Sequence, residues 1–307
     1  MAEKLLVTPR SLTRGANAAV ERLTDAGYQV VTCTAGARPS EDELLRLLPG
    51  CVGYLAGVET ISERVLSAAD RLRVISRNGV GTDAIDIAAA KRKGIKILTT
   101  PGANSEGVAE LAIGLLFALA RGIPQSDATL KAGQWARVSG RELHGTTLGV
   151  VGCGSIGRRV AEIALGIGMD VVGHDPSPAE DFGPRGFRWV ALEELWSVSN
   201  AITLHAPSPG RPIVDAEVLL RIKPGALLVN TARAALIDAD GVISALDTGV
   251  LGGYATDVFD EEPPTDSRLV AHPNVIATPH IGGYTSESIQ RASVGAAENL
   301  LAILKGS

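Results

Sequence analysis

The sequence predicts an α/β protein of two domains, each built on a parallel sheet, and two observations predict it. Short runs of β-branched and aliphatic residues alternate with amphipathic stretches along the whole chain. This alternation is typical of βα units, whose helices cover both faces of a parallel sheet. Near residue 100 of 307, the segment Thr99-Thr100-Pro101-Gly102 interrupts the alternation, and a proline beside a glycine favours a break there.

The first third of the chain contains five expected strands joined by four expected helices. The strands are expected at Leu5–Thr8, Gln29–Cys33, Gly53–Ala56, Arg73–Ser76 and Lys96–Thr99. The helices are expected at Arg14–Ala26, Glu41–Leu48, Ser62–Ala69 and Ile85–Lys91. Because strands and helices alternate throughout, we expect these elements to form one parallel α/β domain.

A second series of elements follows the break. A helix is expected from Asn104 or Ser105 to Arg121, because Asn and Ser are good N-cap residues. Strands are expected at Leu148–Val151, Val171–Gly173, Ala201–Leu204, Leu227–Asn230, Gly253–Asp257 and Val275–Ala277, with a helix from Ile156. The last expected helix, Ser286–Leu304, has room to return to the first domain. The expected division is therefore residues 1–100 with 284–307, and residues 101–283.

Composition excludes several classes of function. The net charge of −5 offers no basic field for nucleic acid. The N-terminus lacks the apolar region of a signal peptide, and the apolar run Leu111–Ala120 is half of what a bilayer requires. Cys33, Cys51 and Cys153 fit neither a zinc pattern nor a disulfide framework. We therefore expect a cytoplasmic protein that binds no metal, membrane or nucleic acid.

A glycine-rich turn is the first sign of a ligand. The sequence Gly152-Cys153-Gly154-Ser155-Ile156-Gly157 follows an apolar strand and opens an amphipathic helix, as a dinucleotide-binding G-x-G-x-x-G requires. Asp175 follows Gly157 by 18 residues, close to the spacing of about 20 for the acid that binds the ribose 2′-hydroxyl. No arginine comes next, so NAD is favoured over NADP. The alternative is a glycine-rich connection followed by a surface aspartate.

Three polar segments follow later strands. They are Asn230-Thr231-Ala232-Arg233, the acidic run from Asp257 to Glu262-Pro263, and Thr278-Pro279-His280. Taken singly, each has an ordinary structural interpretation: a surface ion pair, a solvated loop and a hydrogen-bonding histidine. His144, His174, His205 and His272 are expected to be such ordinary histidines.

With these segments in order, the chain resembles the D-isomer-specific 2-hydroxyacid dehydrogenase family along nearly its whole length. Arg77-Asn78-Gly79-Val80-Gly81-Thr82-Asp83, the glycine-rich turn and the three later segments carry the resemblance. It implies a Rossmann-type doubly wound nucleotide domain and a smaller flavodoxin-like substrate domain. It also implies NAD as cofactor, a small 2-hydroxy or 2-keto acid as substrate, and a homodimer joined through the nucleotide domains. The segment Gly133-Gln134-Trp135 is a candidate dimer contact, with a place for Trp135 in the core of its own domain as the alternative.

The resemblance implies that Arg233, Glu262 and His280 are catalytic. Reduction of a 2-keto acid requires a hydride from nicotinamide and a proton for the new alkoxide. A histidine is a natural proton donor near neutral pH, and a carboxylate beside it favours the protonated ring. An arginine can hold the substrate carboxylate bidentately.

Further contacts are implied by the same resemblance. The implied substrate contacts are Asn78, Gly79, Val80, Asn104 and Arg233, with Asn104 also interpretable as a simple N-cap. The implied cofactor contacts are Gly152, Gly154, Ser155, Ile156, Gly157, Asp175, Ala206, Pro207, Thr231, Ala232, Asp257 and Gly283.

Substrate identity is where the chain departs from some relatives. Phosphoglycerate-specific members tend to carry an arginine after the third strand, where this chain has Ala56-Gly57-Val58-Glu59. A phosphate without a local cation binds poorly, so we expect an unspecified 2-hydroxy acid, with 3-phosphoglycerate as the alternative. Since the chain ends at Ser307, we also expect no C-terminal regulatory domain.

A formate dehydrogenase is disfavoured by Glu262, where those enzymes have Gln. A non-catalytic NAD-sensing binding protein of the same fold remains a further alternative.

Overall fold

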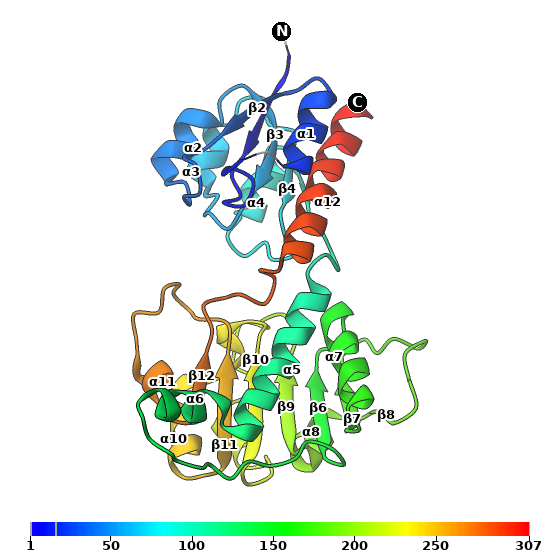
Figure 1. The fold of residues 1–307 in the computed structure, drawn as a ribbon. Helices are drawn as coiled ribbons and strands as arrows, with labels where there is room; N and C mark the ends of the chain where they lie inside the picture. The colour runs from blue at the N-terminus through cyan, green and yellow to red at the C-terminus, as the bar shows by residue number, and fades with distance from the viewer. Residues whose placement is uncertain (1, 16, 307) are drawn as a thin grey trace. The chain divides into compact units, whose positions relative to one another are not determined.

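The computed structural model describes residues 2–15 and 17–306. The chain divides into two compact units (Figure 1): unit 1 comprises Met1–Asn104 and Thr285–Ser307, and unit 2 comprises Ser105–Tyr284. The first boundary lies four residues beyond the expected one, because helix α5 (Ser105–Arg121) begins only after the turn at residues 101–104. Ala16, inside an expected helix, and the terminal residues Met1 and Ser307 lie outside the described residues.

Unit 1 is built on a five-stranded sheet in which every strand pairing is parallel. Its strands are β1 (Lys4–Val7), β2 (Gln29–Thr32), β3 (Cys51–Ala56), β4 (Val74–Arg77) and β5 (Lys96–Leu98). Their spatial order is β2-β1-β3-β4-β5, which is the flavodoxin-like order. The expected smaller α/β domain is therefore confirmed.

Helices cover both faces of this sheet, because successive side chains of a strand point to opposite faces. Leu6 and Tyr54 face one core and Leu5 and Val7 the other. The first core is closed by α2 (Glu41–Leu47), α3 (Glu63–Ala68) and α4 (Ile87–Arg92), and the second by α1 (Ala18–Asp25) and α12 (Ser286–Lys305). Helices α1 to α4 each begin after a side-chain cap, at Asn17, Ser40, Ser62 and Asp86.

Unit 2 is built on a seven-stranded sheet, again with parallel pairings only. Its strands are β6 (Thr147–Val151), β7 (Asp170–His174), β8 (Phe187–Trp189), β9 (Ala201–Leu204), β10 (Ala226–Asn230), β11 (Leu251–Thr256) and β12 (Val275–Ala277). The order β12-β11-β10-β9-β6-β7-β8 is the Rossmann order with one strand added. Strand β8 was not among the expected strands: its sequence Phe187-Arg188-Trp189 contains no run of aliphatic residues.

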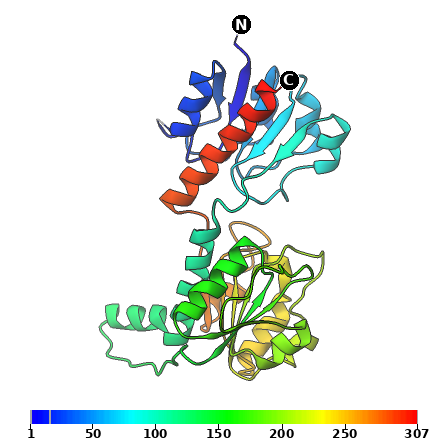
Figure 2. The ribbon, with the colours of Figure 1, turned by 90° about the vertical axis from the view of Figure 1, so that its right-hand side faces the viewer.

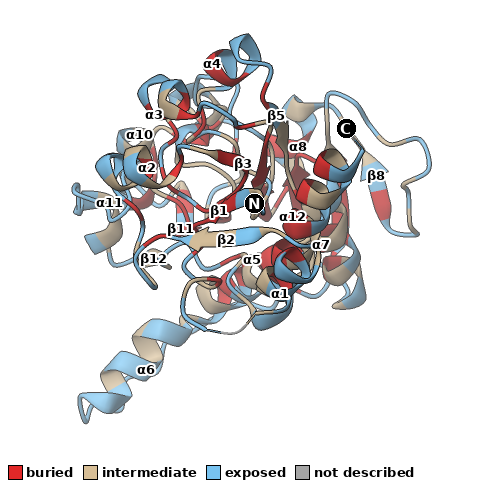
Figure 3. Ribbon diagram, turned by 90° about the horizontal axis from the view of Figure 1, so that it is seen from above, coloured by how far each residue is buried: buried red, intermediate tan, exposed pale blue. Residues whose placement is uncertain are grey.

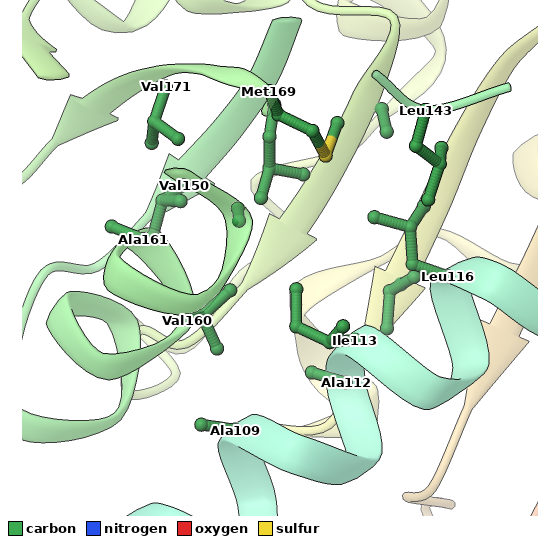
Figure 4. Packing of buried hydrophobic residues seen from close by; sticks show 14 of the residues in the cluster. Ala109, Ala112, Ile113, Leu116, Leu143, Val150, Val160, Ala161, Met169 and Val171 are labelled. Atoms are coloured by element: carbon green, nitrogen blue, oxygen red, sulfur yellow. The ribbon is translucent and has the colours of Figure 1, made fainter. Parts of the chain in front are cut away.

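The faces of the second sheet are covered in the same way. Helices α5 and α7 (Ser155–Gly166) close one core, where Ala112 and Ile113 pack beside Val150 and Val160 (Figure 4). The other face carries α8 (Leu192–Val198), α9 (Ala216–Leu219) and α10 (Ala239–Asp247), while α11 (Arg268–Ala271) lies near β12. Among the described residues, no single helix is long and apolar enough to cross a membrane.

Helix α6 (Ile123–Lys131), like α8 to α11, was not among the expected elements. It begins after Gly122 in a left-handed conformation and contributes no buried residue. Without a buried face it has no apolar period by which a helix is recognised. Figures 2 and 3 show α6 extending away from the rest of unit 2 with a largely exposed surface.

The sheet order positions the candidate site. In an open α/β sheet, ligands bind beyond the carboxyl ends of the strands, where the order reverses. In unit 2 that point lies between β6 and β9, which are neighbours in the sheet. The glycine-rich turn follows β6 directly, and His205 follows β9 directly.

Candidate active site

The glycine-rich turn brings the chain close to the segment after β9. Gly152 has φ +88°, and a Cβ built there would lie 2.6 Å from the backbone nitrogen of Ala206. A side chain at Gly157 would collide with the backbone of Gly152. Helix α7 then begins at Ser155 with no side-chain cap. Its first N–H groups and the positive end of its dipole suit a phosphate.

Asp175 is bonded to this turn. It follows β7, and its Oδ2 accepts a hydrogen bond of 2.9 Å from the N–H of Cys153, inside the glycine-rich sequence. Its Oδ1 accepts another of 2.9 Å from the N–H of Ser177. The structure thus brings the predicted ribose-binding acid to the predicted pyrophosphate turn. Of the other turn residues, Ser155 accepts a hydrogen bond from Ser105 at 3.0 Å, and Ile156 packs against the core.

Two buried polar atoms at the carboxyl edge of the sheet have no partner among the described residues. They are Nδ1 of His205 and Oγ1 of Thr231, which follow the neighbouring strands β9 and β10. Buried polar atoms are normally hydrogen-bonded, so each unpaired one requires an explanation. Burial lowers the pKa of His205 to about 3, so the ring is neutral. Together with the glycine-rich turn, these atoms fit a bound dinucleotide.

His205 is a residue that sequence reasoning missed. We interpreted it as an ordinary histidine, yet its position directly after a strand and before Ala206-Pro207 was a usable signal. Its Nε2 lies 2.8 Å from the Thr203 hydroxyl, and its buried Nδ1 has no partner among the described residues.

The segment after β10 presents Arg233. The fully buried Asn230 accepts the Ala232 N–H through Oδ1 at 3.0 Å and donates to the Arg233 carbonyl through Nδ2 at 2.8 Å. These two bonds fix the turn that carries the arginine. The half-buried Arg233 side chain donates from Nη1 to the Ala232 carbonyl at 2.7 Å.

Asp257 connects the segment after β11 to the segment after β12. It is 1% exposed, and its carboxylate accepts hydrogen bonds from the Thr278 hydroxyl at 2.6 Å, the Ile281 N–H at 2.8 Å and the Gly282 N–H at 2.7 Å. Three bonds from groups on both sides of His280 hold that histidine in place. His280 itself has φ +54°, a conformation that non-glycine residues seldom adopt.

His280 and Glu262, which are 18 residues apart, meet at this edge. The Nδ1 atom of His280 lies 2.7 Å from Oε1 of Glu262. The Phe259 N–H also donates to the same oxygen at 3.4 Å. The two side chains keep 54% and 41% of their surface exposed, so the pair is open to a ligand.

Unit 1 holds the expected substrate contacts at the carboxyl end of β4. Asn78 donates its N–H to the Ala56 carbonyl at 2.9 Å, and Val80 is 46% exposed. The Gly79 N–H is already engaged by the Arg77 carbonyl at 2.9 Å and the Thr100 hydroxyl at 3.0 Å. The one N–H of Gly79 is thus used within the chain.

The structure does not support one of the two interpretations of Asn104, that of a simple N-cap. Its side-chain Oδ1 is buried and accepts no hydrogen bond from any described residue. It therefore does not cap α5, which begins at the next residue. Gly283, implied as a cofactor contact, is half-buried directly after the bonded Gly282, and Pro207 is exposed.

The fold and the site define a dinucleotide-binding α/β protein with a histidine–carboxylate pair, and comparison with known proteins gives its family. Residues 113–282 match the model described as "D-isomer specific 2-hydroxyacid dehydrogenase, NAD binding domain". The chain belongs to the D-isomer-specific 2-hydroxyacid dehydrogenase family, and it carries that family's NAD-binding domain. The family and the cofactor expected from the sequence are thereby confirmed.

Relatives and solved structures agree with this. A D-3-phosphoglycerate dehydrogenase from Rattus norvegicus is 39% identical over 92% of this chain and 54% of its own length. A hydroxypyruvate reductase from Thermotoga maritima is 38% identical over 85% of this chain and 87% of its own length. The crystal structure of a D-lactate dehydrogenase from Aquifex aeolicus with NAD and lactic acid is 30% identical, with a TM-score of 0.85 over 98% of this chain and 96% of that one. The chain spans about half the length of the phosphoglycerate dehydrogenase relative.

Proposed function

We propose that the protein is an NAD-dependent oxidoreductase that interconverts a small D-2-hydroxy acid and its 2-keto acid. The observation that carries this proposal is the 2.7 Å contact between His280 and Glu262 at the carboxyl edge of the NAD-binding sheet. NADH, when bound, supplies the hydride. In our proposal the glycine-rich turn holds its pyrophosphate and Asp175 its ribose hydroxyls.

His280 is proposed as the acid in reduction and the base in oxidation. Because Nδ1 is bonded to Glu262, Nε2 is the nitrogen that remains for proton exchange with the substrate oxygen. Glu262 orients the ring through this bond. Arg233, on the turn fixed by Asn230, binds the substrate carboxylate and polarises the carbonyl. In unit 1, the N–H groups of Val80 and Gly81 are proposed as further carboxylate donors.

The substrate that we propose carries no phosphate. The turn after β3 places Glu59 where a phosphate-binding cation is expected in phosphoglycerate-specific relatives. Glu59 is 2% exposed, and its Oε1 is bonded by the Tyr54 hydroxyl at 2.6 Å, the Gly57 N–H at 2.8 Å and the Thr8 hydroxyl. These partners are uncharged, so they do not offset repulsion between this carboxylate and a phosphate dianion. An unphosphorylated acid such as hydroxypyruvate is therefore favoured over the 3-phosphate.

A substrate panel tests this function. With NADH, we expect turnover of at least one of hydroxypyruvate, glyoxylate and pyruvate, with a higher kcat/KM than for 3-phosphohydroxypyruvate. Chiral chromatography should identify the product from hydroxypyruvate or pyruvate as the D-acid; the product from glyoxylate is achiral. The opposite order of kcat/KM would make the protein a D-3-phosphoglycerate dehydrogenase. Binding of NADH without turnover of any keto acid would instead support a non-catalytic NAD-sensing protein.

Removing the acceptor that Glu262 offers His280 should lower kcat for reduction. In Glu262→Ala the Nδ1 atom of His280 loses its 2.7 Å partner, so the ring is no longer held in one orientation. We expect kcat to fall about 10- to 100-fold, because proton transfer depends on the position of the reacting group. Glu261→Ala is the matched control, since Glu261 accepts from Thr265 and does not contact His280. An unchanged kcat in Glu262→Ala would remove Glu262 from this role.

We also propose that the protein is a homodimer joined through unit 2. Helix α6 buries none of its own residues, and residues 131–142 after it are exposed without interruption. This surface carries large apolar side chains: Ile123, Leu130, Trp135 and Val138 are 52%, 58%, 83% and 53% exposed. Clustered exposed apolar residues are typical of an interface.

A cytoplasmic location is proposed as well, since the three cysteines are buried and free.

Trp135→Ser should weaken such a dimer. Buried aromatic residues contribute most of the binding energy of an interface, often about 2 kcal/mol or more each. The variant should dissociate at higher protein concentration than wild type, as measured by analytical ultracentrifugation. Leu220→Ser is the control, because Leu220 is 85% exposed elsewhere on unit 2. A monomeric wild-type chain, or equal dissociation of both variants, would refute the proposed interface.

A further inference from the structure

Thr100 makes three hydrogen bonds to Gly79 in the proposed carboxylate-binding loop, residues 78–81. We call these three bonds the clasp. Its Oγ1 accepts from the Gly79 N–H at 3.0 Å, and its hydroxyl donates to the Gly79 carbonyl at 3.3 Å. Its backbone N–H donates to the same carbonyl at 3.0 Å. Gly79 has φ +142° and turns the chain between Asn78 and Val80. Both polar groups of this turning residue are therefore held by one threonine.

The clasp determines which N–H groups of the loop remain for a ligand. The Gly79 N–H is occupied, whereas the N–H groups of Val80 and Gly81 bond to no acceptor in residues 2–15 and 17–306. Successive unpaired N–H groups in a turn form a concave site that favours anions. Val80 is also 46% exposed, so a ligand can reach this part of the loop.

Thr100 is itself held from the opposite side. It is only 6% exposed, and a Cβ built on Gly295 of α12 would lie 3.2 Å from its Cγ2. The neighbouring Thr99 carbonyl accepts a hydrogen bond of 2.9 Å from Asn299, also on α12. Because α12 fills the space beside it, Thr100 cannot shift without displacing the helix.

We propose that Thr100 is a positioning residue that holds Gly79 so that the N–H groups of Val80 and Gly81 form a preset site for the substrate carboxylate. This rests on the proposed 2-keto acid reduction. Groups held in place before binding lose less entropy when the ligand arrives. Loosening the clasp should therefore weaken carboxylate binding without affecting proton or hydride transfer.

Thr100→Val and Thr100→Ser separate the hydroxyl from the methyl group. Thr100→Val removes both hydrogen bonds of the hydroxyl and should raise the KM for the best keto acid about 3- to 10-fold, the scale on which hydrogen bonds contribute. Its kcat and its KM for NADH should stay within about twofold of wild type, as expected when only uniform binding is lost. Thr100→Ser should keep the wild-type KM. A wild-type KM in Thr100→Val, or an equal rise in Thr100→Ser, would overturn the proposal.

A second readout needs no turnover. In amide hydrogen exchange, oxalate, which resembles a 2-keto acid, should protect the amides of residues 80 and 81 in wild type and less so in Thr100→Val. Equal protection in both proteins, or none in wild type, would overturn the role of Thr100. If wild type protects these amides yet reduces no keto acid, the proposed function fails and the positioning role stands.

Gly295→Ala tests the clasp if Thr100→Val does not fold. Its new methyl group would crowd Thr100 Cγ2, so the KM for the keto acid should rise. Adding Thr100→Ser removes Cγ2 and should bring the KM back toward wild type. Additive effects of the two changes, or no effect of Gly295→Ala, would contradict the supporting role of α12.

Discussion

Replacing His280 with Ala should lower kcat for keto acid reduction by about 10²–10⁴-fold, because a positioned acid–base group contributes about that much. The KM for NADH should change little, since the contacts of the glycine-rich turn and Asp175 do not involve this side chain. Stopped-flow measurement of NADH oxidation under single-turnover conditions would assign the loss to the chemical step.

His144→Ala is the matched control for this variant. His144 is an exposed histidine of the same unit that packs against Gly168, before β6 rather than after a strand. Its removal should leave kcat unchanged. A near-wild-type kcat in His280→Ala would remove His280 from the mechanism and would mean that another group supplies the proton.

Replacing Asp257 with Ala should lower kcat by about 10²-fold, although Asp257 bonds to no atom of the His280 ring. The carboxylate holds Thr278, Ile281 and Gly282 on both sides of the histidine. Without it these donors lose their acceptor, at a cost of about 1–3 kcal/mol for each buried group. A displacement of about 1 Å at the reacting group is enough for a loss of this size.

Asp247→Ala is the control for Asp257→Ala, because Asp247 is a 66% exposed aspartate in the same unit whose nearest partner is His272 at 3.4 Å. We expect wild-type kcat and melting temperature for the control. For Asp257→Ala we expect a lower melting temperature and a lower kcat. A variant that loses stability but keeps its kcat would limit Asp257 to a structural role.

The sequence was sufficient where the chemistry lies within one short segment. The turn at Gly152–Gly157 and the acid at Asp175 belong to a single strand–helix–strand unit, so their spacing alone places them together. The pairing of His280 with Glu262 could not be predicted from their separation in the sequence. It required the family resemblance, because the loops that bring them together have no periodic pattern.

Other features were beyond sequence reasoning for physical reasons. The clasp between Gly79 and Thr100 joins loops that follow neighbouring strands, and neither residue type marks such a contact. Asp257 was assigned to the cofactor from the resemblance, whereas its three bonds within the chain were visible only in the structure. Helix α6 buries no residue and so leaves no apolar pattern to detect.

The position of α12 has a consequence for synthesis of the chain. This helix supplies Ala296, Ala297, Leu300 and Leu304 to one core of unit 1, although the rest of that unit precedes residue 105. Unit 2 is contiguous and can fold as soon as it leaves the ribosome. The strands of unit 1, by contrast, keep one sheet face partly uncovered until α12 has been translated, so the core of unit 1 is completed only after the whole of unit 2 has been made.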